Sequence, residues 1–84
     1  MAAYKEDFAV GSFVRIAGAQ YLRDFQITWK FHNKLSSEQL EFADRIAQVK
    51  NVYFYHGGDV LYKLQGVPGI WHEQCLQSAK QETG

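Results

Sequence analysis

The sequence predicts a sheet-dominated α+β domain with five strands and one short inserted helix near residues 37–45. Three observations support this prediction. Stretches of alternating apolar and polar residues recur along the chain, which is typical of strands with one buried face. Glycine-containing turns separate these stretches, and the pair Gly57-Gly58 is typical of a tight hairpin. A capping motif in front of residues 37–45 predicts the helix.

Composition and length narrow the class of protein. A hydrophobic content of 46% and an aromatic content of 15% exclude intrinsic disorder in a chain of 84 residues. Nine basic and nine acidic residues give zero net charge, which argues against long-range steering to nucleic acid or lipid and favours self-association. The sequence has no apolar run of transmembrane length and no signal peptide core. We expect one cytoplasmic domain, 1–84, without membrane contact and with flexible ends at 1–8 and 78–84.

Two apolar patterns near the N-terminus predict strands. A strand at 12–17 would place three apolar residues on one side and Arg15 on the other. The apolar residues of this side are Val10, Val14 and Ile16. The clearest alternation of the chain spans residues 25–32 and predicts a second, half-buried strand. Its predicted buried side consists of Phe25, Ile27, Trp29 and Phe31.

A helix start follows the second predicted strand. Ser36 is an N-cap candidate, and Gln39 three residues later completes a capping box. Leu35 and Leu40 have the spacing of a hydrophobic staple around this cap. The predicted helix, 37–45, is too short to be stable alone, so it must pack on the sheet.

The C-terminal half predicts a hairpin followed by a short strand. Strand-forming residues span 49–65 on both sides of the glycine pair, and a change of phase predicts a bulge near Lys50-Asn51. A turn at 66–69 precedes a short last strand at 70–72. Leu76 is expected to return to the core.

Two stretches, 11–16 and 49–76, resemble the strands and turns of SH3-like small barrels. The segment from Gly69 to Leu76 is similar to the last turn of the C-terminal barrel in nitrile hydratase β subunits, where a tryptophan precedes a closing leucine. The resemblance implies a five-stranded, partly open barrel with the 37–45 helix as an insertion. It implies no catalytic site, because the metal motif of nitrile hydratases belongs to their other subunit. A likeness of fold does not transfer function.

The density of aromatic residues is the strongest functional signal. Adjacent strand residues point to opposite faces, so the aromatic residues of the predicted hairpin cannot all reach one core. Exposed tyrosine and tryptophan clusters are typical of binding surfaces. The predicted binding residues are Tyr53, Tyr55, Leu61, Tyr62, Trp71 and His72. The alternative is that the helix, or a second copy of the chain, covers this face.

The sequence gives weaker signals for chemistry. His72 and Cys75 have the spacing of a zinc-ligand pair, but a structural site needs a second pair. His32, His56 and Asp59 lie at positions typical of an ordinary surface. The glycine pair between His56 and Asp59 leads into a strand, whereas a phosphate-binding loop leads into a helix. We therefore predict no catalytic residues, no metal and no cofactor. The single cysteine cannot form an internal disulfide, which fits a reducing compartment.

These patterns favour a small, non-catalytic interaction module that uses an aromatic sheet surface for protein binding or self-association. Two alternatives stay open. One is a small barrel that binds nucleic acid by stacking bases on its aromatic residues. The other is an enzyme whose active site forms only between subunits.

Overall fold

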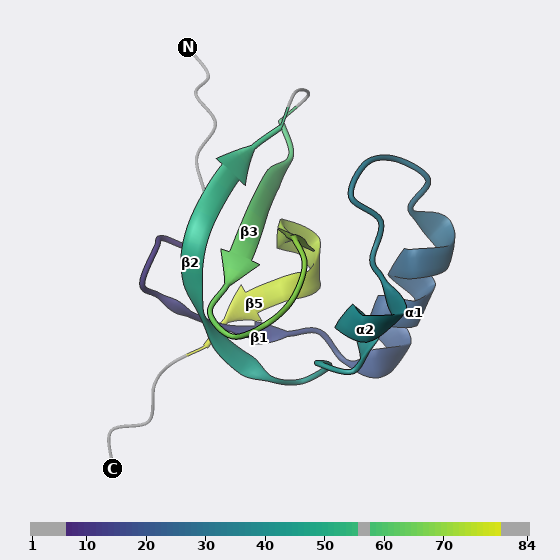
Figure 1. The fold of residues 1–84 in the computed structure, drawn as a ribbon, viewed down its shortest axis with the longest axis horizontal. Helices are drawn as coiled ribbons and strands as arrows, with labels where there is room; N and C mark the ends of the chain where they lie inside the picture. Colours follow the sequence, from purple (N-terminus) through teal and green to yellow (C-terminus); the bar gives the residue numbers. More distant parts are fainter. Residues whose placement is uncertain (1–6, 56–57, 80–84) are drawn as a thin grey trace.

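The computed structural model describes residues 7–55 and 58–79. Its elements are β1 (Phe13–Ile16), α1 (Ala19–Thr28), α2 (Ser37–Leu40), β2 (Ile46–Phe54), β3 (Val60–Leu64), β4 (Trp71–His72), the 3-10 helix η1 (Glu73–Cys75) and β5 (Leu76–Ser78). The strands form one antiparallel sheet in the order β4-β3-β2-β1-β5. Both α-helices lie in the long connection between β1 and β2, beside the hairpin (Figure 1). The predicted sheet-dominated α+β class is therefore confirmed. The described sheet is open, because its end strands β4 and β5 are not paired with each other.

The predicted first strand is present as β1. Val14 and Ile16 are fully buried, whereas Arg15 between them is exposed. Val10 does not share their buried side, since 62% of its surface is exposed. The positive φ of 93° at Gly11 turns the chain before the strand begins, so the alternation does not extend back to Val10.

The predicted strand at 25–32 is wrong, because α1 occupies residues up to Thr28. Two of the four residues that were predicted to be buried, Ile27 and Phe31, are 66% and 68% exposed. The buried residues of α1 are Leu22 and Phe25, which have helical spacing. The preceding segment, with Ala19 and Leu22, contains strong helix formers, and together they override the alternation that follows.

The predicted capping box is present at the start of α2. The Gln39 amide donates to the Ser36 hydroxyl at 3.3 Å, and the Ser36 amide donates to the Gln39 side chain at 2.9 Å. The helix itself is shorter than the predicted 37–45, since it ends at Leu40 and continues as turns. Gln39 is 3% exposed, and its Nε2 also donates to the carbonyl of Ile70 at 3.0 Å. This side chain therefore joins α2 to the turn before β4.

Ser36→Ala is expected to lower the free energy of unfolding by about 0.5–2 kcal/mol, because the Gln39 amide loses its side-chain acceptor. Urea denaturation followed by circular dichroism measures this change. Ser37→Ala is the matched control, since Ser37 is the neighbouring exposed serine and makes no capping bond. Equal midpoints for the Ser36 variant and the wild type would contradict the assignment of the cap.

The predicted hairpin is present as β2 and β3. Tyr53 pairs with Leu61, and the register shifts between Val49 and Asn51, where the bulge was expected. The glycine pair of the predicted turn lies partly outside the described residues, which include Gly58 but not residue 57. β2 is shared between two neighbours: its first part pairs with β1 and its second part with β3.

The C-terminal segment contains more structure than predicted. β4 occupies part of the predicted last strand, but η1 and β5 follow it. Leu76 is buried, as predicted. Within the predicted flexible ends, Phe8 packs against the core and Ser78 pairs with Val14 of β1. The other residues of those ends lie outside the described part, apart from Asp7 and Ala79.

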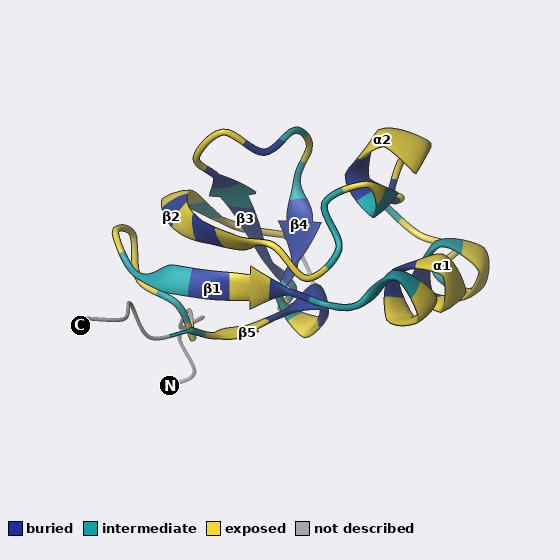
Figure 2. Ribbon diagram, turned by 90° about the horizontal axis from the view of Figure 1, so that it is seen from below, coloured by how far each residue is buried: buried dark blue, intermediate teal, exposed yellow. Residues whose placement is uncertain are grey.

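The core combines buried residues of the strands with Leu22, Phe25 and Leu35 of the insertion that carries α1 and α2. Figure 2 shows buried residues on β3 and β4 and exposed residues along much of α1 and α2. The largest fully buried side chains are Trp71, Tyr62, Ile16, Leu22, Leu64 and His72. His72 is the only titratable imidazole in this group, and it lies beside the candidate site.

Candidate functional site

The hairpin and β4 have an inner and an outer face. Val52, Tyr62 and Trp71 are cross-strand neighbours on the inner face and belong to the core or pack against it. Because strand residues alternate, their neighbours form a row on the outer face. This outer row consists of Tyr53, Leu61 and His72.

The insertion covers part of this outer face. The His72 ring lies 4.9 Å from the Phe25 ring and 4.8 Å from the Trp29 ring, measured between centroids. Its Nε2 donates to the carbonyl of Asn33 at 2.7 Å. Only 2% of His72 remains exposed, so this imidazole anchors the insertion to the sheet.

A second histidine, His32, joins the insertion to the hairpin. Its Nε2 lies 2.7 Å from a carboxylate oxygen of Asp59, and its Nδ1 lies 2.9 Å from the side-chain oxygen of Asn33. Its ring stacks on Tyr55 with centroids 3.8 Å apart and planes at 19°. The Trp29 indole donates to the His32 carbonyl at 2.6 Å. The contacts with Asp59 and Tyr55 connect residues that are far apart in the sequence.

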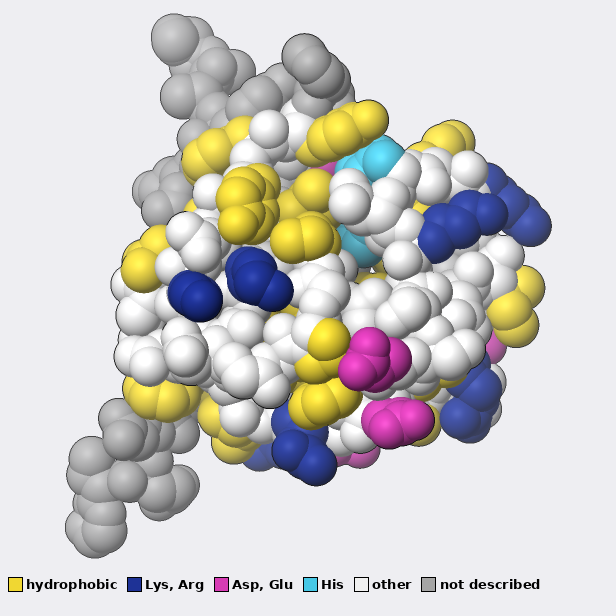
Figure 3. Space-filling model, viewed as in Figure 1, with side chains coloured by type: hydrophobic (Ala, Val, Ile, Leu, Met, Phe, Trp, Pro, Cys, Tyr) yellow, Lys and Arg dark blue, Asp and Glu magenta, His cyan; other side chains and the backbone are white. Residues whose placement is uncertain are grey.

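The rings of this region form a connected surface, which we call the aromatic strip. Trp29 contacts both Phe31 and His32, and His32 contacts Tyr55. Tyr55 directly follows β2 and comes two residues after Tyr53, so the two side chains are on the same side of the chain. The aromatic strip consists of Trp29, Phe31, His32, Tyr53 and Tyr55. Phe31, Tyr53 and Tyr55 are 68%, 42% and 40% exposed. Figure 3 shows hydrophobic and histidine side chains gathered on one face over the hairpin.

The structure divides the six predicted binding residues into two groups. Tyr53 and Tyr55 are exposed and lie in the aromatic strip. The four buried residues are Leu61, Tyr62, Trp71 and His72, each at most 4% exposed. The alternation placed Trp29, Phe31 and His32 in a strand, so their contribution to this surface was not predicted. The helical spacing of Leu22, Phe25 and Trp29 was the signal that could have revealed it.

The two histidines have opposite pKa shifts. The pKa of His32 lies above its ordinary value of 6.5, because Asn33 and Asp59 present oxygens to both ring nitrogens, although burial opposes the shift. The pKa of His72 lies below 6.5, mainly because burial penalises the charged ring and also because His32 is near. The two rings therefore titrate over different pH ranges, and His32 keeps its proton to a higher pH than His72 does.

These shifts predict a maximum of stability near pH 6.5. The contribution of His32 is complete below 6.5 and is lost as the pH rises through its raised pKa. The contribution of His72 is complete above 6.5 and is lost as the pH falls through its lowered pKa. Urea midpoints measured from about pH 5.5 to about pH 8 in a His56→Gln background test this, because only these two imidazoles then titrate. His32→Gln should flatten the alkaline side of the curve, and an unchanged alkaline side would contradict the prediction.

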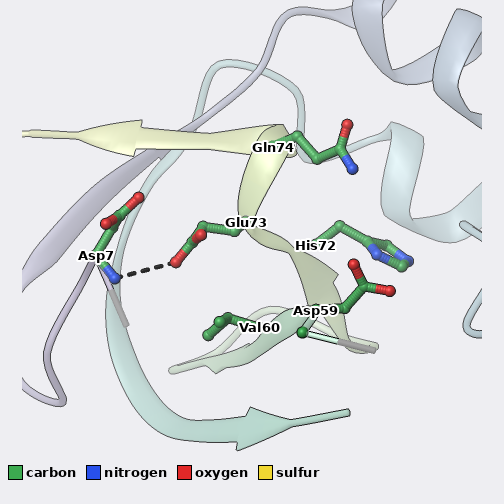
Figure 4. Close-up of a pocket in the computed structure, with 7 residues that line it drawn as sticks. Asp7, Asp59, Val60, His72, Glu73 and Gln74 are labelled. Carbon is green, nitrogen blue, oxygen red and sulfur yellow. Dashed lines mark hydrogen bonds between the residues drawn. The ribbon is translucent and has the colours of Figure 1, made fainter. Parts of the chain in front are cut away.

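A pocket of about 250 Å³ lies beside the buried His72. Its lining residues are Asp7, Gly58, Asp59, Val60, His72, Glu73 and Gln74 (Figure 4). The Glu73 carboxylate accepts from the Asp7 amide at 3.0 Å and from the Tyr62 hydroxyl. Burial and this carboxylate raise the pKa of Tyr62. Glu73 therefore joins the N-terminal segment at Asp7 to Tyr62 of β3.

The possible zinc ligands do not form a site in the described part of the chain. Burial raises the pKa of Cys75 to about 12, which disfavours the thiolate that zinc requires. No group of three or more His, Cys, Asp or Glu side chains among residues 7–55 and 58–79 is placed to hold a metal ion. The described helices also include none that is long and apolar enough to span a membrane.

Comparison with known proteins finds no matching family model, no matching curated protein and no matching solved structure. The geometry of the aromatic strip and its surroundings is therefore the basis for inferring a function.

Proposed function

We propose that this chain is a small, non-catalytic interaction module that associates with a second copy of itself through the aromatic strip. The observation that carries the proposal is the run of ring contacts from Phe31 through Trp29 and His32 to Tyr55, with Tyr53 beside it. Aromatic residues are enriched in protein interfaces, where they bury large areas with little loss of side-chain freedom.

The internal contacts of the strip support this role. His32 and Tyr55 are stacked, and the His32–Asp59 and His72–Asn33 hydrogen bonds attach the insertion to the hairpin. A surface that is ordered before binding pays a smaller entropic cost when a partner docks. The zero net charge of the chain also leaves no overall repulsion between copies.

We also propose a barrel type for the fold and a cellular location for the chain. The strand order, the sharing of β2 between β1 and β3, and the long insertion between β1 and β2 support an SH3-like, partly open barrel. Cys75 is the single cysteine of the chain and has no partner for an internal disulfide, which supports a cytoplasmic location, where thiols stay reduced.

Sedimentation of the wild-type protein at high micromolar concentration tests the proposal, with a dimer as the expected result. Tyr53→Glu should weaken the association by about tenfold or more, because a charge would have to be buried in the interface. Tyr21→Glu is the matched control, since Tyr21 is similarly exposed, at 46%, but belongs to α1. A change at Leu61 is unsuitable, because Leu61 is buried and its replacement by lysine would disturb the fold.

A monomeric wild type would refute self-association. Equal weakening by the Tyr21 and Tyr53 variants would refute the assignment of the interface to the aromatic strip. Two other results would support the alternative functions instead. Salt-dependent binding of single-stranded nucleic acid that requires Tyr53 would favour a nucleic-acid-binding barrel. A dimer in which both copies line one cavity with histidine would favour an active site between subunits.

A further inference from the structure

His32 lies within the aromatic strip and has an oxygen atom opposite each of its ring nitrogens. Its Nε2 is 2.7 Å from Oδ2 of Asp59, and its Nδ1 is 2.9 Å from Oδ1 of Asn33. The oxygens of an ionised carboxylate and of an amide only accept hydrogen bonds, so both ring nitrogens must donate. This arrangement therefore fits the protonated ring, and the stacked Tyr55 ring presents a favourable face to that cation.

Asp59 supplies the countercharge for this ring. In residues 7–55 and 58–79, no other charged side chain forms an ion pair or hydrogen bond with His32. Asp59 also lies beside the strip, because its carbonyl accepts from the Tyr55 amide at 2.8 Å. A neutral ring could keep its bond to Asn33 after rotation of the amide, but it could not neutralise Asp59. The side chains of His32 and Asp59 are 16% and 40% exposed, so the pair lies at the surface.

The other groups around His32 come from the insertion and from β4. The Trp29 ring meets it edge-on at 5.6 Å between centroids, and neither this indole nor the Asn33 amide titrates. His72 lies 5.5 Å away, and because burial holds its pKa below 6.5, it is neutral above that pH. Figure 4 shows the Asp59 carboxylate next to His72. Near neutral pH, the charge of this part of the strip therefore depends on His32 and Asp59.

We propose that the protonation of His32 controls self-association through the aromatic strip, so that the chain associates more tightly when this ring is charged. The proposal depends on the self-association proposed above and specifies its regulation. A partner that covers the strip also covers the His32–Asp59 pair, because His32 contacts the Tyr55 ring and, through Trp29, the Phe31 ring. With the proton, each copy buries a pair without net charge. Without it, each copy buries a carboxylate that has no countercharge, which is more costly.

The direction of the pH dependence follows from the linkage between protonation and association. Loss of the proton from a buried pair leaves an uncompensated charge, so the pKa of His32 should be higher in the dimer than in the monomer. This contribution to association is complete when the ring is protonated in the monomer, and it is lost as the pH rises through the pKa of the dimer. The pKa of His32 already lies above 6.5 in the single chain, which places the transition above pH 6.5. An increase of about half a unit in this pKa at each of two copies corresponds to about tenfold in the dissociation constant.

Sedimentation from about pH 6.5 to about pH 8.5 tests this regulation in a His56→Gln background, where His32 is the imidazole expected to titrate. The dissociation constant should rise by about tenfold across this range. His32→Gln removes the titrating ring, so its association should be weak and should not change further with pH. The N-terminal amine titrates in every variant, so its effect cancels in the comparison.

Two further variants separate the charge of the pair from its shape. His32→Arg keeps a cation beside Asp59 throughout the range, so its association should not depend on pH. Asp59→Asn removes the carboxylate, so the weakening at alkaline pH should disappear, because deprotonation of His32 no longer leaves a buried charge. Glu41→Gln is the matched control for the lost carboxylate, since Glu41 is exposed at the end of α2, and it should retain the weakening.

The outcomes separate this inference from the function on which it depends. A wild type that is monomeric at every pH refutes both. A dimer whose dissociation constant stays unchanged or falls as the pH rises keeps the proposed function and refutes the regulation. Equal alkaline weakening in His32→Gln and in the background protein also refutes the regulation, because another group would then be responsible.

Nuclear magnetic resonance provides a test that needs no change at His32 or Asp59. Ring chemical shifts of the His56→Gln protein give the pKa of His32 in dilute monomer and at concentrations where the dimer forms. We expect the higher value in the dimer. An equal or lower value in the dimer would overturn the proposal, even if variants of the pair fail to fold.

Discussion

Trp71→Ala is expected to lower the free energy of unfolding by about 3–5 kcal/mol. Trp71 is fully buried on the inner face of β4, beside Tyr62, and its indole donates to the carbonyl of Pro68 at 3.1 Å. Removal of the indole would leave a cavity in the core and an unpaired carbonyl in the turn before β4. A small domain has a total stability of about 5–15 kcal/mol, so this single change would remove a large part of it.

Urea denaturation followed by circular dichroism measures the effect of Trp71→Ala. Trp71→Phe is the control that keeps an aromatic ring but removes the hydrogen bond to Pro68, and it should cost clearly less. A loss below about 1 kcal/mol for the alanine variant would mean that the core can collapse around the missing ring, contrary to the expected cavity.

Trp29→Ala is expected to cost about 3 kcal/mol, near the lower end of the range for tryptophan, because Trp29 is only partly buried. Its ring stacks on Phe25 at 5.1 Å and contacts Phe31, and its indole holds the carbonyl of His32. The variant should lose local order in the insertion as well as global stability, because these contacts place the insertion against the hairpin. Hydrogen exchange should therefore increase most in residues 29–35, and the aromatic strip should lose its order.

Trp29→Phe separates the two consequences of the alanine change. It retains the ring contacts with Phe25 and His72 but loses the hydrogen bond to His32. We expect intermediate stability and intermediate exchange for this variant. Uniform exchange along the whole chain in Trp29→Ala would contradict the local role, since it would mean that the insertion and the sheet unfold together.

Elements with local causes could be predicted from the sequence alone. The capping box joins residues three positions apart, and both of its hydrogen bonds are present. The alternation around the hairpin defined the faces of β3, and the bulge followed from a change of phase within a few residues. The same alternation divided the aromatic residues of the hairpin between two faces, so some of them were expected to be exposed, because one core cannot bury both faces of a strand.

Residues 25–32 were ambiguous because their apolar positions fit two periods. Phe25 and Trp29 satisfy the helical spacing as well as the alternation, and only the helix formers before them and the packing of Leu22 decide between the two. The length of α2 was overestimated for a related reason. The capping box defines where a helix starts, but the end depends on what the following residues contact.

The composition of the aromatic strip was decided by tertiary structure. The His32–Asp59 bond joins residues 27 positions apart, and the His72–Asn33 bond joins residues 39 positions apart. Neither pair shares a local pattern, so nothing in the sequence near His32 indicates that it stacks on Tyr55 or that His72 is buried. The sequence by itself determined β1, the hairpin of β2 and β3, and the surplus of aromatic residues. The packing of the insertion against the hairpin decided which of those residues remain at the surface, because burial depends on contacts between distant segments.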